Sequence, residues 1–139
     1  MRTAVIIIFL SLLTNGIQAQ NKQTVVDQKS NHQSLESQMK NYFMVILTKG
    51  PIRGQDSITL AKLMDGHMAN IERLAKEGKL VLAGPFLDDG NLRGIFVFDA
   101  ATEIEARKLV ESDPAVKVGR FAYEIHPWMG PIKLTTLLK

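Results

Sequence analysis

The sequence predicts an α+β sandwich, in which a four-stranded antiparallel sheet carries two helices on one of its faces. Two stretches have apolar residues at the three- and four-residue steps of a helix, and four shorter stretches are apolar and rich in β-branched or aromatic residues. Glycine, proline and aspartate separate them where turns are expected. The resulting order is strand, helix, strand, strand, helix, strand, which suits one helical layer on one sheet.

Residues 1–19 have the features of a secretory signal peptide. Arg2 provides a positive charge, Ala4–Leu13 an apolar core and Ala19 a small residue for cleavage. The core is shorter than the about 20 residues of a membrane-spanning helix, so we expect cleavage and no stable membrane insertion. We therefore expect export, to a periplasm or out of the cell, of a chain that has no cysteine and hence no disulfide.

Residues 20–40 are rich in glutamine, serine, asparagine and lysine. Such a segment buries too little apolar surface to offset its ordering entropy, so we expect a polar disordered tether. Residues 41–139 are enough for one folded domain. The formal net charge of +3 and the scattered basic residues predict no nucleic-acid partner.

The first strand is predicted over residues 42–48. Val45 and Leu47 on one face and Met44 and Ile46 on the other are all apolar. A strand of this kind needs cover on both faces. Because the helices cover only one face, we expect a second copy of the sheet on the other, and hence a homodimer.

The first helix is predicted to run from the two capping candidates Asp56 and Ser57 to Lys76. Its inward stripe consists of Leu60, Leu63, Met64, Met68, Ile71, Leu74 and Ala75. His67 falls within this stripe, so its side chain is expected to point inward. Gly78 then suits a left-handed end of the helix.

Two strands follow, over residues 79–86, ending at Gly84 and Pro85, and over residues 92–98. The loop at 87–91 contains an Asp-Gly pair, which predicts a hairpin turn with positive φ.

The second helix is predicted to begin at the capping box of Thr102 and Glu105. It is expected to stop at Pro114, because proline disfavours helix in the residue before it. Asp113 stands three residues past Val110, at the end of the inward stripe. A final strand is predicted over about 119–125 and is expected to end at Pro127, followed by an apolar tail.

Four pieces of this pattern are D-G-H-M-A-N-I-E-R-L from Asp65, K-L-V-L-A-G-P-F from Lys79, E-S-D-P from Glu111 and F-A-Y-E-I-H-P-W from Phe121. Their order and spacing resemble the YciI-like (YCII-related domain) family, including its DGPF group, over residues 42–128. The resemblance implies a ferredoxin-like βαββαβ subunit that dimerises sheet to sheet, as a dimeric α+β barrel.

The same resemblance implies a chemistry. Family members are proposed to carry a His–Asp pair in a pocket, which corresponds here to His67 and Asp113, and one similar protein eliminates chloride from a chlorinated hydroquinone. The chain departs from the family pattern at Ala83, where the DGPF group has an aspartate, and in its export signal.

An imidazole held by a carboxylate has a fixed tautomer and raised basicity, as a general base near neutral pH requires. His67 and Asp113 would then form a dyad for isomerisation, elimination or lyase-type chemistry on a small cyclic or carbonyl compound, without a cofactor. The residues alone leave open a structural role for a buried His67 and turn chemistry for Asp113. The second hypothesis is therefore a non-catalytic module whose dimer pocket binds a small ligand.

Gly84 and Pro85 are expected to shape the strand end beside this pocket, and His126 and Arg120 are candidates for substrate contact. The alternatives are a rim or packing role for His126 and a solvated side chain for Arg120. The histidines lack metal-ligand spacing, so we expect no metal site. The sequence also has no phosphate-binding glycine-rich loop and no serine nucleophile elbow. Haem or flavin-type oxygen chemistry is a third hypothesis.

Overall fold

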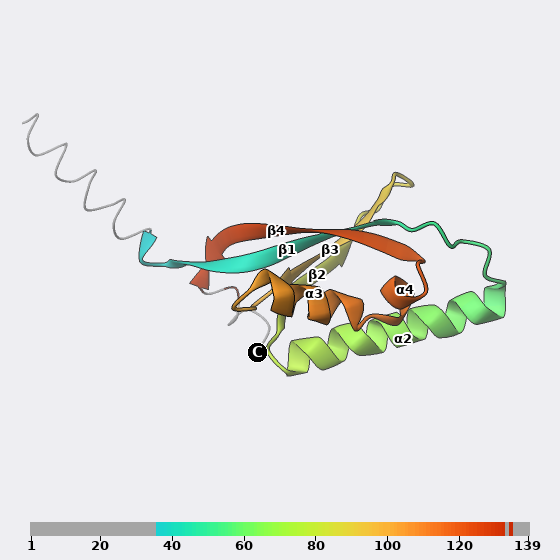
Figure 1. Ribbon diagram of the computed structural model, residues 1–139, viewed down its shortest axis with the longest axis horizontal. Coiled ribbons are helices and arrows are strands. Elements are labelled where there is room, and N and C mark those ends of the chain that lie inside the picture. The colour runs from blue at the N-terminus through green and yellow to red at the C-terminus, as the bar shows by residue number, and fades with distance from the viewer. Residues whose placement is uncertain (1–35, 133, 135–139) are drawn as a thin grey trace, which may run out of the picture. The chain divides into compact units, whose positions relative to one another are not determined.

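The computed structural model describes residues 36–132 and 134. The expected signal peptide and most of the expected tether lie outside the described residues. The elements, in chain order, are β1 (Met39–Lys49), α2 (Ser57–Lys76), β2 (Leu80–Pro85), β3 (Leu92–Phe98), α3 (Glu103–Glu111), α4 (Pro114–Lys117) and β4 (Phe121–Pro131) (Figure 1). Within the described ranges, no helix combines the length and apolar character that crossing a membrane requires.

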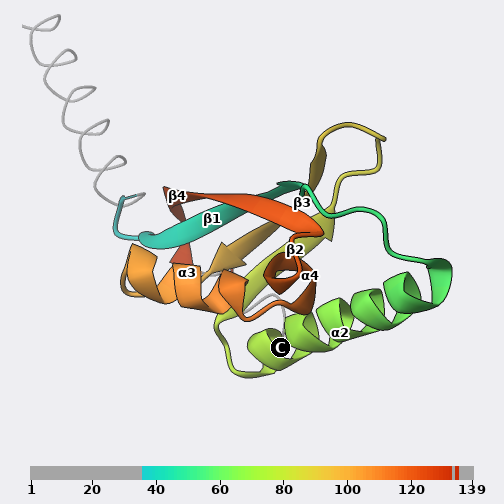
Figure 2. The same ribbon diagram turned by 45° about the vertical axis from the view of Figure 1, so that its right-hand side comes forward.

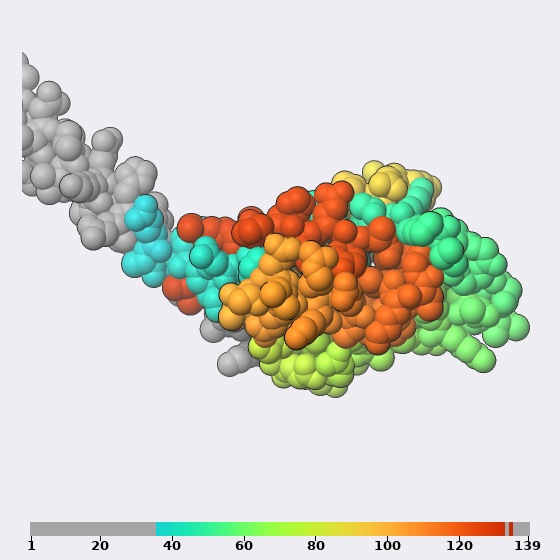
Figure 3. Space-filling model, in the orientation of Figure 1, coloured from blue at the N-terminus to red at the C-terminus, as the bar shows by residue number. Residues whose placement is uncertain are grey.

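The four strands form one antiparallel sheet in the order β2-β3-β1-β4. In two views 45° apart, α2, α3 and α4 all lie on the same side of this sheet (Figures 1 and 2). The space-filling view shows α3 and α4, in orange, between β4 and α2 (Figure 3). The predicted ferredoxin-like α+β fold is therefore confirmed.

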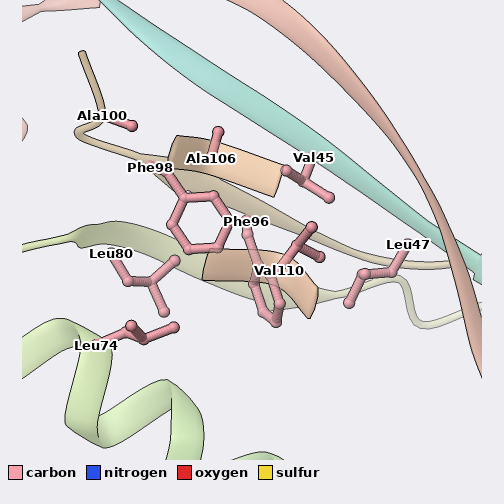
Figure 4. Close-up of a cluster of buried hydrophobic side chains, with 9 residues drawn as sticks. All are labelled: Val45, Leu47, Leu74, Leu80, Phe96, Phe98, Ala100, Ala106 and Val110. Atoms are coloured by element: carbon pink, nitrogen blue, oxygen red, sulfur yellow. The ribbon is translucent and has the colours of Figure 1, made fainter. Parts of the chain in front are cut away.

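The main core lies between the sheet and the helices. Phe98 and Val45 from the sheet meet Ala106 and Val110 from α3, all four with no exposed surface, and Leu74 of α2 is 1% exposed (Figure 4). These residues fall at the positions that the helical and strand patterns assign to the inside. This core fixes α2 and α3 against the sheet.

The other side of the sheet, the second face, has a smaller cluster. Tyr42 and Val97 are buried there, with Trp128 and Leu134 packed against them. The Tyr42 hydroxyl donates to the Pro131 carbonyl at 3.0 Å, and burial raises the pKa of this phenol. The apolar tail predicted to pack on another surface thus contributes Leu134 to the second face of its own sheet.

Two strand boundaries differ from the prediction. β1 begins at Met39, inside the segment expected to be a tether. β4 runs from Phe121 to Pro131 and passes through Pro127, which was expected to end it. Because β4 is an edge strand paired only with β1, the missing N–H of Pro127 leaves no neighbour unpaired.

One local prediction was wrong, and one helix was not predicted. Positive φ occurs among the described residues at Gly78 (70°) and Gly119 (72°), not at Gly90. Gly90 instead leaves room for the Asp88 carboxylate, which would lie 2.9 Å from a Cβ there. The second helix does end before Pro114 as predicted, since α3 stops at Glu111 and Asp113 is extended, but Pro114 then begins a further short helix, α4, that was not predicted. Proline suits the first helical turn because its missing N–H would have no partner there.

Candidate active site

His67 is positioned by the inward stripe of α2 and is 8% exposed. Its ring lies 5.9 Å from the Phe96 ring, nearly parallel, and 5.3 Å from the Phe121 ring, edge on. Its Nδ1 lies 2.7 Å from Oδ2 of Asp113, 46 residues away in the sequence. Two aromatic rings and one carboxylate therefore fix the imidazole.

Asp113 stands between α3 and α4 and has no exposed surface. Its Oδ1 accepts the backbone N–H of Ala115 at 2.8 Å and so caps α4, while Oδ2 accepts from His67 and, at 3.4 Å, from Nδ2 of Asn70. Both carboxylate oxygens are thus used by the protein. Asp113 therefore acts on a ligand only through His67, as a positioning residue.

Asn70 connects the His67–Asp113 pair through hydrogen bonds to Arg73 and Ser112. Its Oδ1 accepts from Nη2 of Arg73 at 2.7 Å and lies 3.1 Å from the Ser112 hydroxyl. Sequence reasoning missed Asn70, although it follows His67 by three residues and so shares its helical face. Among the described residues, every side-chain nitrogen or oxygen atom that is itself shut off from solvent has a hydrogen-bond partner.

Gly66 allows α4 to approach α2. A Cβ at this position would lie 3.3 Å from Cγ of Pro114, closer than side chains ordinarily pack. This mid-helix glycine therefore faces the ring of the residue that follows Asp113. The short approach brings Asp113 within reach of His67.

The contact with Asp113 determines which imidazole nitrogen is available. An ionised carboxylate only accepts hydrogen bonds, so Nδ1 carries a hydrogen, and in the neutral imidazole Nε2 then carries a lone pair. Among the described residues, Nε2 has no hydrogen-bond partner. His67 lines a pocket of about 300 Å³ between α2 and the sheet. The other lining residues are Leu47, Met64, Met68, Ile71, Ala83, Gly84, Pro85, Arg93, Gly94, Phe96 and Phe121.

The predicted contact residues divide into two groups. Gly84 and Pro85 line the pocket, whereas Arg120 does not line it and only directly precedes Phe121, which does. His126 lies opposite Met44 on the second face, where its side chain is 52% exposed and its Nε2 is 3.5 Å from Glu124 Oε2. The structure therefore does not bring His126 to this pocket.

Arg93 is the pocket residue that sequence reasoning missed. It is half-buried at the start of β3, and an arginine there gave no signal in the strand pattern. Among the described residues, no group of three histidines or carboxylates gathers as metal ligands would.

Comparison with known proteins gives a family and several likenesses among solved structures. The model of the YCII-related domain family matches residues 43–129. Muconolactone isomerase is 16% identical with a TM-score of 0.52, over 63% of this chain and 86% of that one, which shows a shared fold. 5-Chloro-2-hydroxyhydroquinone dehydrochlorinase from Burkholderia phenoliruptrix AC1100, in complex with 2,5-dihydroxybenzoquinone, is 26% identical with a TM-score of 0.47, over 62% of this chain and 92% of that one. No curated protein sequence matches this chain.

Proposed function

The chain belongs to the YCII-related domain family, and we propose that it is a small cofactor-independent enzyme of the isomerase or lyase kind. His67 acts as its general base and acid on a small cyclic or carbonyl compound. The observation that carries this proposal is Nε2 of His67, which has no hydrogen-bond partner in the part of the chain that the structure describes and belongs to a residue that lines an apolar pocket.

The reaction that this geometry supports begins with the substrate between the rings of Phe96 and Phe121 and the methionines of α2. Nε2 of His67 takes a proton from a carbon next to the substrate's carbonyl group, and the electron pair moves onto the carbonyl oxygen. The imidazolium that forms is stabilised by the Asp113 carboxylate at 2.7 Å.

Two outcomes complete the reaction with balanced atoms and charge. In isomerisation, the imidazolium returns the proton to another carbon of the same enolate. In elimination, the electron pair forms a double bond and expels a leaving group with its bonding electrons, and the proton stays on His67 until it passes to water.

Export and dimer formation are also part of the proposal. The apolar run after Arg2 supports export. The half-buried Ile46 and Ile95 on the second face support a homodimer, because a sheet packed on a second sheet would cover them.

The alternative function is a non-catalytic binding module. It is favoured by the closed hydrogen-bond network of Asp113, Asn70, Arg73 and Ser112, which would also hold a structural imidazole. In such a module Nε2 of His67 accepts a hydrogen bond from the ligand and removes no proton.

Deuterium exchange separates the two functions. Small cyclic ketones and unsaturated lactones are incubated with the purified protein in D₂O, and loss of their C–H signals is followed by proton NMR. We expect wild-type protein to catalyse exchange and His67→Gln to lower the rate by roughly 100-fold or more. His126→Gln is the matched control, and it keeps the wild-type rate. Equal rates in wild type and His67→Gln would contradict catalysis by this residue.

A further inference from the structure

Three arginines, Arg53, Arg93 and Arg120, gather at one end of the sheet and are called here the arginine cluster. Arg93 lines the pocket, Arg120 directly precedes the pocket residue Phe121, and Arg53 belongs to the segment between β1 and α2. In Figure 1 that segment and the β2–β3 hairpin lie at the same end of the sheet. The proposed chemistry gives none of the three a role.

Arg93 reaches the pocket because of a β-bulge. Leu47 of β1 pairs with Gly94, but its neighbour Thr48 pairs with Leu92, so Arg93 is an extra residue in β3. A regular strand would send Arg93 and Gly94 to opposite faces, whereas both line the pocket here. Bulges re-aim side chains in this way beside binding sites.

Arg120 and Arg53 are held next to each other. Nη1 of Arg53 donates to the Arg120 carbonyl, and Nη1 of Arg120 donates to the Arg53 carbonyl, each at 3.5 Å. Arg120 also donates to Oε1 of Gln55 at 3.2 Å. Burial, and then the charges of Arg53 and Arg93, lower the pKa of Arg120 from its ordinary value.

The arginine cluster has no acidic partner among the described residues. Arg73 and Arg107 each form an ion pair with a glutamate of their own helix, at 2.8 Å in both cases. No such pair involves the arginine cluster, and Lys49 adds a positive charge on β1, with its ammonium group on the carbonyl of Asp89. Hairpin carboxylates Asp88 and Asp89 form no ion pair with the cluster in the described ranges.

Like charges held close together repel each other, and a bound anion removes that repulsion. The Arg93 guanidinium makes no hydrogen bond to the described protein atoms, so its planar set of N–H donors is available to a carboxylate. The rest of the pocket offers apolar and aromatic surface.

We propose that the pocket takes a small cyclic carboxylate. Its anionic group binds Arg93, with Arg120 and Arg53 adding positive potential at the mouth, and its ring lies over Phe96 and Phe121 beside Nε2 of His67. This inference rests on the proposed function and deepens it by naming the substrate class.

The test measures the binding of three probes by calorimetry at low ionic strength: benzoate, its neutral isostere benzamide, and inorganic phosphate. We expect wild-type protein to bind benzoate at least tenfold more tightly than benzamide or phosphate. Arg93→Gln is expected to weaken benzoate binding by about ten- to hundredfold, the value of a charge-assisted hydrogen bond, and to leave benzamide binding unchanged.

Arg107→Gln is the matched control, because Arg107 is half-exposed on α3 and paired with Glu103. Undetectable benzoate binding, equal affinity for benzoate and benzamide, or equal affinity for benzoate and phosphate would overturn the inference. Equal effects of Arg93→Gln and Arg107→Gln would do the same, once thermal unfolding has shown that both variants are folded.

His67→Gln keeps the two proposals separate. Benzoate binding that survives in His67→Gln, together with unchanged deuterium exchange, refutes the catalytic role and leaves the anion site in place. Exchange that depends on His67 while benzoate binding ignores Arg93 refutes the anion site and leaves the catalytic role in place.

Discussion

On each side of the sheet a histidine lies beside a carboxylate. The two pairs differ in distance, in exposure and in how far apart their residues are in the sequence. On the helical side, His67 and Asp113 are 2.7 Å apart, with side chains 10% and 0% exposed. On the second face, His126 and Glu124 are 3.5 Å apart, with side chains 52% and 66% exposed. The first pair joins residues 46 apart in the chain, and the second joins residues two apart on one strand.

The difference shows what makes a histidine available for chemistry. The His126 pair follows from strand alternation alone, and water screens its interaction. The His67 pair requires α2, α3 and α4 to be packed in one arrangement, which excludes water from the carboxylate and leaves one nitrogen open. A nearby carboxylate is therefore not enough to hold an imidazole in one orientation. The carboxylate must also be buried.

The largest effect is expected from removing the buried charge. Asp113→Asn replaces one acceptor oxygen with a donor group, so either His67 or the Ala115 N–H faces another donor. We expect a loss of roughly 3 kcal/mol in the free energy of unfolding, measured by urea denaturation. Glu124→Gln, the same change on the second face, is expected to cost less than about 0.5 kcal/mol. Similar losses in the two variants would remove the contrast between the faces.

Dimer formation would reduce the difference in exposure between the two pairs, because it would cover the second face and with it His126. We expect sedimentation velocity to give twice the mass of one chain. Ile46→Lys places a charge in that interface and is expected to weaken the dimer by roughly 100-fold, or about 2.8 kcal/mol. Ile104→Lys, a change of an exposed isoleucine on α3, leaves the mass unchanged. A monomeric wild type would refute the sheet-to-sheet dimer.

The close approach of α4 to α2 gives a smaller effect. In Gly66→Val the new side chain meets the Pro114 ring, so α4 must shift and carry Asp113 with it. We expect a loss of about 1–2 kcal/mol in unfolding free energy and altered ¹⁵N shifts of the His67 ring. Ala69→Val adds the same branched group at an exposed position of α2. An unchanged His67 ring in Gly66→Val would show that the approach does not position Asp113.

The smallest effect concerns the other helix-capping aspartate, which is exposed. The N–H and then the hydroxyl of Thr59 lower the pKa of Asp56 below its ordinary value. The stabilisation is therefore complete above the ordinary pKa of about 3.8 and is lost as the pH falls through the lowered value. We expect wild type to melt slightly above Asp56→Asn at neutral pH, and the difference to vanish in acid. A difference that grows in acid would reverse the assigned sign.

The features predictable from the sequence were those set by local rules. The end of α2 at Lys76, the left-handed Gly78 and the inward position of His67 all follow from helical periodicity and capping, and the cap is Asp56, one of the two candidates. The order of strands and helices was predictable in the same way, because turn and capping residues separate neighbouring apolar stretches of the sequence.

The unpredicted features depend on contacts between distant segments. The bulge that sends Arg93 into the pocket depends on how β1 pairs with β3, and Asn70 matters only because Asp113 arrives beside it. Pro127 stays in a strand because β4 lies at the edge of the sheet, which the sequence of β4 alone does not encode. Such pairings become visible only in three dimensions.

One carboxylate, that of Asp113, begins a helix with one oxygen and orients an imidazole with the other. A relative of this protein without the proposed catalysis would still need the aspartate to fold, and the aspartate would still need a donor such as the histidine. The pair is therefore a poor marker of activity when relatives are surveyed. The guanidinium of Arg93 supports no described part of the fold, so the fold does not constrain this position. A substitution at Arg93 would therefore be the first sign of a change of substrate.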